Sequence, residues 1–294
     1  MNYLAHFGLR EPPFGITPDT SFFFPCRSSQ QALNTLLIAL DNGEGFIKIT
    51  GEVGTGKTML CRKFLATLDE TAWVSAYIPN PNLEPRALLF AFAEELGVGL
   101  DPGLDQYRLL KGLTRSLLDL ARTRRRVVLC MDESQAMPLD TLEALRLLTN
   151  LETEKRKLLQ VVLFGQPELD RKLASESVRQ LRQRITFQHD LQTLDEDEVG
   201  AYFTHRLRVA GYAGPALLAA GARRSLYQAS RGVPRLVNIL SHKTLLLLYG
   251  EDGDRIERRH VHAAAIDTPA AVQPRRWWSL PRLRLSLRKN SARA

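Results

Sequence analysis

A glycine-rich segment that ends in Lys-Thr carries the residue types best suited to chemistry in this chain of 294 residues. The pattern G-x-x-x-x-G-K-T is met by Gly51, Glu52, Val53, Gly54, Thr55, Gly56, Lys57 and Thr58. The backbone N–H groups of such a loop form an anion-binding nest, and the helix that follows adds its positive dipole end. We expect Lys57 to reach the terminal phosphates and the Thr58 hydroxyl to ligate Mg²⁺. The segment, together with Met59, therefore predicts a site for a nucleoside triphosphate, with ATP and Mg²⁺ as cofactors.

Two adjacent carboxylates form the second candidate group. Asp132 and Glu133 follow directly on the apolar run 127–131, which we interpret as a strand. We expect this strand to lie beside the phosphate loop, so that Asp132 points at the Mg²⁺ shell. Glu133 would then accept a proton from the attacking water. This arrangement favours hydrolysis over phosphoryl transfer to a small acceptor.

Gln166 is a third candidate, because it comes just after the apolar run 158–164. In P-loop ATPases with an additional strand, a polar residue at this place contacts the γ-phosphate or the attacking water. The alternative is an amide that only forms a turn.

Three arginines, Arg179, Arg182 and Arg184, precede the expected strand 185–187. A cation here would act as an arginine finger that stabilises charge on the γ-phosphate of a neighbouring subunit. Arg184 is the first choice and Arg182 the second. The alternative is an ordinary basic helix end in solvent. A finger at this place would require the active form to be an oligomer.

The segment 231–235 has the sequence Arg-Gly-Val-Pro-Arg. Pro234 suits the first turn of a helix, and Arg235 would then project back toward the nucleotide. An arginine at that place would distinguish ATP from ADP and move a lid. A plain helix start explains the glycine and the proline, but it leaves Arg235 unexplained.

Alternating strands and helices position these groups. We expect strands at 46–50, 72–78, 127–131, 158–164 and 185–187, and helices at 28–40, 58–68, 85–96, 106–121 and 139–151. Ser28 and Gln31 suggest a capping box for the first helix. The alternation predicts an α/β fold with a parallel five-stranded sheet between helical layers, an αβα sandwich.

After Leu194 the pattern becomes helical throughout, with helices expected at 195–210, 215–230, 234–249 and 257–266. Acidic residues open the first of these helices, and Pro215 is placed to start the second. We interpret the segment as a small all-helical lid domain. The predicted organisation is an arm at 1–25, a P-loop core at 26–192, the lid at 193–268 and a tail at 269–294.

The arm and the tail differ from the body in composition. The arm is rich in aromatic residues and prolines, so we expect it to pack on the domain and close over the nucleotide base. Residues 275–294 carry seven basic and no acidic residues, against a net charge of +8 for the chain. The nearly neutral body gives no support to a DNA-binding core. With Trp277 and Trp278, the tail would lie on anionic lipid; a disordered basic tail is the alternative.

Several classes of protein are disfavoured. Cys26, Cys61 and Cys130 are odd in number and lack metal-ligand spacing, and we expect Cys61 and Cys130 to be buried apolar residues. The sequence shows no signal peptide and no apolar run long enough to cross a bilayer. A cytoplasmic protein, peripheral at most on the inner membrane, is expected.

The basic run 122–126 is interpreted as a solvated helix end in preference to a binding patch.

Together these motifs resemble the AAA+ ATPases of the ExeA/GspA type, and most closely those of the MshM type, accessory to biogenesis of the mannose-sensitive haemagglutinin (type IV) pilus. The resemblance covers residues 1–268 and is carried by segments 3–9, 13–18, 51–58, 132–135, 164–169 and 231–235. It implies ATP hydrolysis by a homo-oligomer that helps assemble or localise an envelope complex, with pilus or secretion proteins at the inner membrane as partners.

The chain departs from the longer members of this family. They continue into a membrane-spanning helix and a peptidoglycan-binding region, and this sequence has neither, so the shorter cytoplasmic type is expected. Two other functions stay open. One is a DNA-dependent AAA+ regulator of the transposition type, which the neutral body disfavours. The other is a nucleotide-gated scaffold that scarcely hydrolyses ATP.

Overall fold

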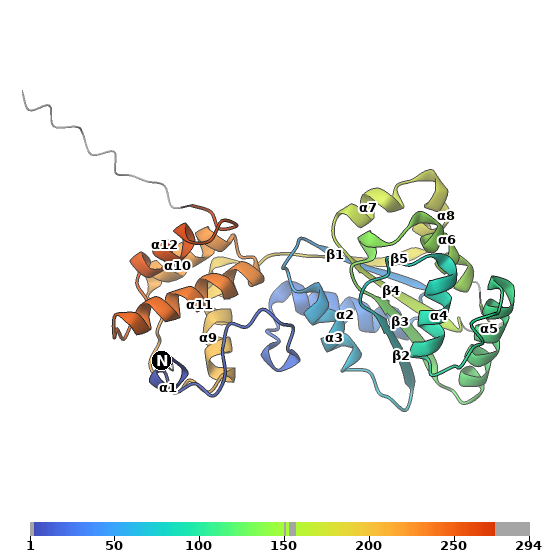
Figure 1. The fold of residues 1–294 in the computed structure, drawn as a ribbon, viewed down its shortest axis with the longest axis horizontal. Helices are drawn as coiled ribbons and strands as arrows, with labels where there is room; N and C mark the ends of the chain where they lie inside the picture. Colours follow the sequence, from blue (N-terminus) through green and yellow to red (C-terminus); the bar gives the residue numbers. More distant parts are fainter. Residues whose placement is uncertain (1–2, 150, 153–156, 274–294) are drawn as a thin grey trace, which may run out of the picture.

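The computed structural model describes residues 3–149, 151–152 and 157–273 (Figure 1). The basic tail, on which the lipid-binding hypothesis rests, lies outside the described residues. Among the helices that are described, none is long and apolar enough to cross a membrane.

The core is built on a single sheet of five parallel strands. They are β1 (Phe46–Gly51), β2 (Trp73–Ile78), β3 (Arg126–Met131), β4 (Leu159–Gly165) and β5 (Ile185–Leu191), arranged in the order β2-β3-β4-β1-β5. The predicted five-stranded parallel sheet is confirmed. β4 lies between β1 and β3, yet Asp132, directly after β3, still reaches Thr58 at the end of the phosphate loop.

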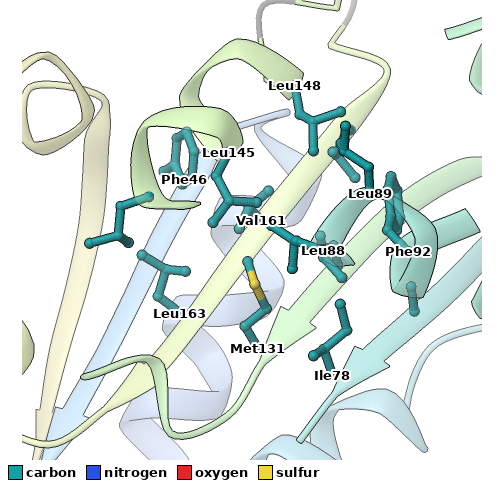
Figure 2. Packing of buried hydrophobic residues seen from close by; sticks show 14 of the residues in the cluster. Phe46, Ile78, Leu88, Leu89, Phe92, Met131, Leu145, Leu148, Val161 and Leu163 are labelled. Atoms are coloured by element: carbon teal, nitrogen blue, oxygen red, sulfur yellow. The ribbon is translucent and has the colours of Figure 1, made fainter. Parts of the chain in front are cut away.

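Helices cover both faces of the sheet, because alternate residues of the buried strands point to opposite sides. Val161 and Leu163 pack with α4 (Pro85–Glu95), α5 (Gln106–Arg122) and α6 (Leu139–Leu148), as Figure 2 shows for part of this cluster. Val162 and Phe164 pack with α2 (Arg27–Asp41) and α3 (Lys57–Leu65) on the other face. Cys61 and Cys130 are fully buried in this second cluster, as expected.

The start of α2 corrects the predicted capping box. Its N-cap is Cys26, which makes no side-chain capping bond, and Ser28 is already inside the helix. The Ser28 hydroxyl instead accepts a hydrogen bond of 2.9 Å from the backbone N–H of Gln192, just beyond β5. Packing of the helix start against β5 therefore takes the hydroxyl that a local capping box would use.

The C-terminal part is helical, as predicted, and consists of α9 (Glu196–Val209), α10 (Ala220–Ser230), α11 (Pro234–Gly250) and α12 (Arg258–Ile266). The prediction that Pro215 starts a helix is wrong, because α10 begins at Ala220. The residues before it are held against the segment that precedes α12: the Ile256 N–H donates to the Leu217 carbonyl at 2.7 Å. This pairing competes with helix formation at 215–219.

The aromatic arm packs mainly on the lid. Phe7, Phe14 and Phe22 are buried in the same hydrophobic cluster as Phe203 and other residues of α9 to α12. Phe14 stacks on Phe203 with ring centroids 4.9 Å apart. Figure 1 shows this N-terminal segment, which includes the short helix α1 (Tyr3–His6), beside α9 and α11. Three short helical segments of the core, α7 (Glu168–Leu173), η3 (Glu176–Val178) and α8 (Arg179–Arg182), were not predicted as helix.

Candidate nucleotide site

The phosphate loop joins β1 to α3 through left-handed glycines. Gly54 and Gly56 have φ angles of +83° and +101°, which residues with a Cβ rarely adopt. The Lys57 ammonium donates to the carbonyls of Gly51 (2.7 Å) and Glu52 (3.0 Å). Burial lowers the pKa of Lys57, while the charges of Glu133 and Asp132 act in the opposite direction. The loop therefore holds a buried cation against two of its own backbone carbonyls.

Thr58 and Asp132 are in direct contact, although β4 separates the two strands that precede them, β1 and β3, in the sheet. The Thr58 hydroxyl donates to the Asp132 carboxylate at 2.5 Å. Burial raises the pKa of Asp132, and the hydrogen bonds from Thr58 and the Glu133 N–H partly offset this rise. The Tyr77 hydroxyl lies 3.5 Å from the same carboxylate, and burial with that neighbouring charge raises the pKa of Tyr77 to about 12.

These two side chains suit a small divalent cation. A hydroxyl and a carboxylate are the hard oxygen ligands that Mg²⁺ prefers beside nucleotide phosphates. The donor set therefore fits Mg²⁺, and the assignment of Thr58 and Asp132 as its ligands stays a prediction. Elsewhere in the described part of the chain, no cluster of three or more His, Cys, Asp or Glu residues could hold a metal.

Glu133 stands in a network of amides. The Gln166 side chain donates to the Glu133 carboxylate at 3.0 Å, and the Gln135 side chain donates to the same oxygen. The side-chain amide oxygen of Gln135 in turn accepts a hydrogen bond of 2.9 Å from the backbone N–H of Gln166. Glu133 has a φ of +50°, a strained angle of the kind that clusters at functional sites. β4 thus brings Gln166 to the predicted base, and its contact with the γ-phosphate or the attacking water stays a prediction.

Gln135 is a site residue that sequence reasoning missed. It lies within segment 132–135, which carries the family resemblance, but no pattern in the sequence assigns it a role of its own. The pairing of β3 with β4 is what brings it against Gln166, and no local pattern in the sequence encodes that contact.

The lid reaches the loop through Arg235. The backbone N–H of Arg235 donates to the Gly54 carbonyl at 3.2 Å. A Cβ added at Gly54 would lie 2.8 Å from the Arg235 Cβ, so a glycine is needed for this approach. Phosphate loop, lid and arm together enclose a pocket of about 230 Å³, whose lining includes Lys57, Glu133, Gln166 and Arg235.

The candidate finger arginines lie away from this pocket. They precede β5, whereas the site forms where the strands end, at the opposite edge of the sheet. Arg184 donates to the Arg146 carbonyl (3.3 Å) and the Thr149 hydroxyl (3.4 Å), and Arg182 is exposed. The structure thus does not bring them to their own chain's nucleotide site. A role toward a neighbouring subunit stays a prediction.

The basic run after α5 makes ordinary surface contacts. Arg122 pairs with Asp119 at 2.8 Å, and Arg125 donates to the Glu70 carbonyl at 3.1 Å. The Arg126 guanidinium lies 5.3 Å from the Trp73 ring centroid. These contacts agree with a solvated helix end.

Known proteins share both the sequence and the fold. Residues 40–173 match a family model described as an AAA domain. This chain is 41% identical to general secretion pathway protein A of Aeromonas hydrophila over 281 residues, which are 94% of the chain. The chain spans about half the length of that relative, 50%.

Solved structures with this fold include the Aeropyrum pernix ORC2 protein, with a TM-score of 0.64 at 16% identity, covering 90% of this chain and 73% of that one. The structure of Cdc6p from Pyrobaculum aerophilum has a TM-score of 0.66 at 18% identity, and the match covers 87% of this chain and 70% of that one. The Thermotoga maritima RuvB branch migration motor has a TM-score of 0.54 at 18% identity, and the match covers 82% of this chain and 69% of that one. At such identities these likenesses show the fold alone. The chain therefore has the α/β P-loop ATPase fold, contains a segment that matches an AAA domain, and is similar in sequence to general secretion pathway protein A.

Proposed function

We propose that this chain hydrolyses ATP, with Mg²⁺, in the pocket between phosphate loop, arm and lid. One observation carries the proposal: side chains from three separate segments, Lys57, Thr58, Glu133 and Gln166, line that pocket, and Asp132 is in contact with Thr58. A nucleotide-binding protein without turnover has no need for a strained carboxylate held by two amides beside the phosphate site.

Each residue has a distinct role in this proposal. The loop N–H groups and Lys57 bind the β- and γ-phosphates, and Thr58 and Asp132 hold Mg²⁺. Bound Mg²⁺ neutralises charge on the phosphate oxygens. Glu133 accepts the proton of the attacking water, and Gln166 orients that water or the γ-phosphate.

The residues outside this central group act on the same phosphate. Arg235, carried by the lid, contacts the γ-phosphate and so couples hydrolysis to lid movement. Arg184, or else Arg182, supplies positive charge to the site of the next subunit in a homo-oligomer. The contact between Gly54 and Arg235 supports the first assignment, and the distance of Arg184 from its own pocket supports the second.

We further propose that this activity drives assembly or localisation of a secretion complex, of which the MshM-type pilus system is the finer candidate. The support is the similarity to general secretion pathway protein A, which extends beyond the AAA domain to 94% of the chain. Arm 1–25, core 26–192, lid 193–268 and tail 269–294 are the proposed units, and the partners are assembly proteins at the inner membrane.

Phosphate release by the purified protein tests the proposal. Glu133→Gln should bind ATP as the wild type does but turn it over at least about 100-fold more slowly. Glu168→Gln, which changes an exposed carboxylate at the start of α7, is the matched control and should leave the rate unchanged. Equal rates for wild type and Glu133→Gln would contradict the proposal, and stimulation by duplex DNA would favour the transposition-type alternative.

A further inference from the structure

A buried arginine of the lid holds the arm from inside. Arg206, on α9, is only 4% exposed. Its guanidinium donates to the carbonyls of Pro13 and Gly15 in the arm, the second at 3.2 Å, and to the Tyr202 hydroxyl at 3.0 Å. The Phe22 ring, also from the arm, lies 4.6 Å from the guanidinium carbon. Asn238 of α11 adds a second, weaker hydrogen bond to the Gly15 carbonyl, at 3.4 Å.

This environment is unusual for a buried charge. Within the described residues, the hydrogen-bond acceptors of Arg206 are neutral oxygens and aromatic faces flank it, while the exposed carboxylate of Asp19 in the arm interacts with it only electrostatically, without a hydrogen bond. Removing a cation from water without a carboxylate partner is costly, and an apolar residue could fill the same volume. The planar guanidinium can, however, bind two backbone carbonyls at once and stack on a ring, which fixes a chain segment that has no regular structure.

The same arm is tied to the core a few residues further on. Arg62, on the helix that follows the phosphate loop, donates to the Pro18 carbonyl at 2.9 Å. The Lys63 ammonium lies 5.8 Å from the Phe23 ring centroid. The segment 15–18 between the two attachments lines the nucleotide pocket, and Ile16 is 59% exposed there. The arm therefore bridges the pocket, with one end held by the lid and the other by α3.

We propose that Arg206 is the positioning residue for the base end of the nucleotide site. By fixing the arm to the lid at Pro13 and Gly15, it sets segment 15–18 as the wall against which a purine base packs. Lid movement sensed through Arg235 then opens or closes that wall. The inference rests on the proposed function, because it assigns the base-binding part of the same pocket.

The chemistry of the ligand gives a selective test. A wall for the base acts on ATP and not on a triphosphate that lacks a base, whereas general damage to the fold weakens both. Calorimetric titration of the full chain with Mg·ATP and with Mg·tripolyphosphate separates the two effects. Arg206→Met keeps the length of the side chain and removes its donors, and Arg208→Met changes an exposed arginine of the same helix as a control.

For Arg206→Met we expect the Kd for ATP to rise about tenfold, with the Kd for tripolyphosphate unchanged. In turnover, KM for ATP should rise by a similar factor while kcat stays near the wild-type value. Arg206→Lys keeps the charge but cannot bind both carbonyls, so its loss of affinity for ATP should be intermediate. If the methionine variant does not fold, the comparison of ATP with tripolyphosphate is made with Arg206→Lys. Arg208→Met should behave as wild type.

Two results would overturn the inference while leaving the proposed function intact. One is wild-type ATP affinity in both Arg206 variants. The other is an equal loss of affinity for ATP and tripolyphosphate. Failure of the proposed function has a different signature, since the wild-type chain would then release phosphate no faster than Glu133→Gln, whatever the Arg206 variants bind.

Discussion

The side-chain amide of Gln166 donates a 3.0 Å hydrogen bond to the carboxylate of Glu133. The two residues belong to neighbouring strand ends, 33 positions apart in the sequence. Gln135 closes the group by donating to Glu133 and accepting from the Gln166 backbone. The orientation of the proposed base is thus set jointly by the ends of β3 and β4.

This network predicts non-additive effects on turnover. Gln135→Ala and Gln166→Ala should each lower kcat about tenfold or more, because each frees the Glu133 carboxylate from its position. The double variant should be little worse than the poorer single variant, since the residues act as one unit. Steady-state phosphate release from the three variants makes the comparison. If the two effects simply multiply, the amides act independently and the network account is wrong.

The contact between Gly54 and Arg235 predicts a strict need for glycine. Gly54→Ala adds a Cβ at a φ of +83° and 2.8 Å from the Arg235 Cβ, so it should cost about 1–2 kcal/mol and raise the KM for ATP. Gly99→Ala, whose added Cβ meets nothing within 4 Å, is the control. Thermal unfolding and ATP titration of both variants provide the measurement. Indistinguishable Gly54→Ala and Gly99→Ala proteins would show that the lid does not need this close approach.

Asp132 predicts a pH-dependent conflict between stability and function. Because burial raises its pKa in the folded state, the folded protein binds this proton more tightly than the unfolded chain does. Protonated Asp132 therefore stabilises the folded protein below the ordinary pKa of 3.8, and this stabilisation is lost as the pH rises through the raised pKa. Asp132→Asn should therefore be more stable than wild type at pH 7 without nucleotide, yet lack Mg²⁺-dependent turnover.

Thermal unfolding at several pH values checks this expectation. The stability advantage of Asp132→Asn over wild type should shrink as the pH is lowered toward 4. Ser134→Ala, a change at a buried neighbour that does not titrate, should show no comparable pH dependence relative to wild type. An Asp132→Asn protein less stable than wild type at pH 7 would contradict the proposed cost of the buried carboxylate.

The position of Arg184 predicts complementation between subunits. Arg184→Ala should lower kcat about 10³-fold or more if it serves a neighbour's γ-phosphate, with ATP binding retained. Mixing it with Glu133→Gln should restore part of the activity, since a subunit with intact Glu133 can then receive Arg184 from its neighbour. Thr149→Val, which removes only a partner of Arg184 within the chain, controls for local packing. Mixtures no more active than their components would exclude Arg184 as the finger, and the same experiment then applies to Arg182.

The sequence was most informative where a local pattern determines the structure. Residues 127–131 of β3 form a continuous apolar run, and the left-handed φ angles of Gly54 and Gly56 require glycine, so both features could be predicted. The acidic residues that open α9 likewise mark a helix start within one turn, although the capping box at Asp195 was not predicted. These features need no knowledge of distant contacts.

Features that depend on contacts between distant segments could not be predicted. Ser28 suggests a local cap, but its hydroxyl is taken by Gln192. Pro215 suggests a helix start, but pairing with Ile256 keeps the segment extended. The role of Gln135 depends on β4 lying next to β3, and the attachment of the arm depends on Arg206, almost 200 residues away. In each case a tertiary partner overrides or completes the local signal.

A crystal structure of Glu133→Gln with Mg·ATP would show whether loop, strand ends, arm and lid form one ATP site. We predict the triphosphate on the N–H groups of residues 54–58, with Mg²⁺ at Thr58 and Asp132 and the base against residues 15–18. Nucleotide bound elsewhere, or a triphosphate out of reach of Lys57 and Gln166, would contradict the account.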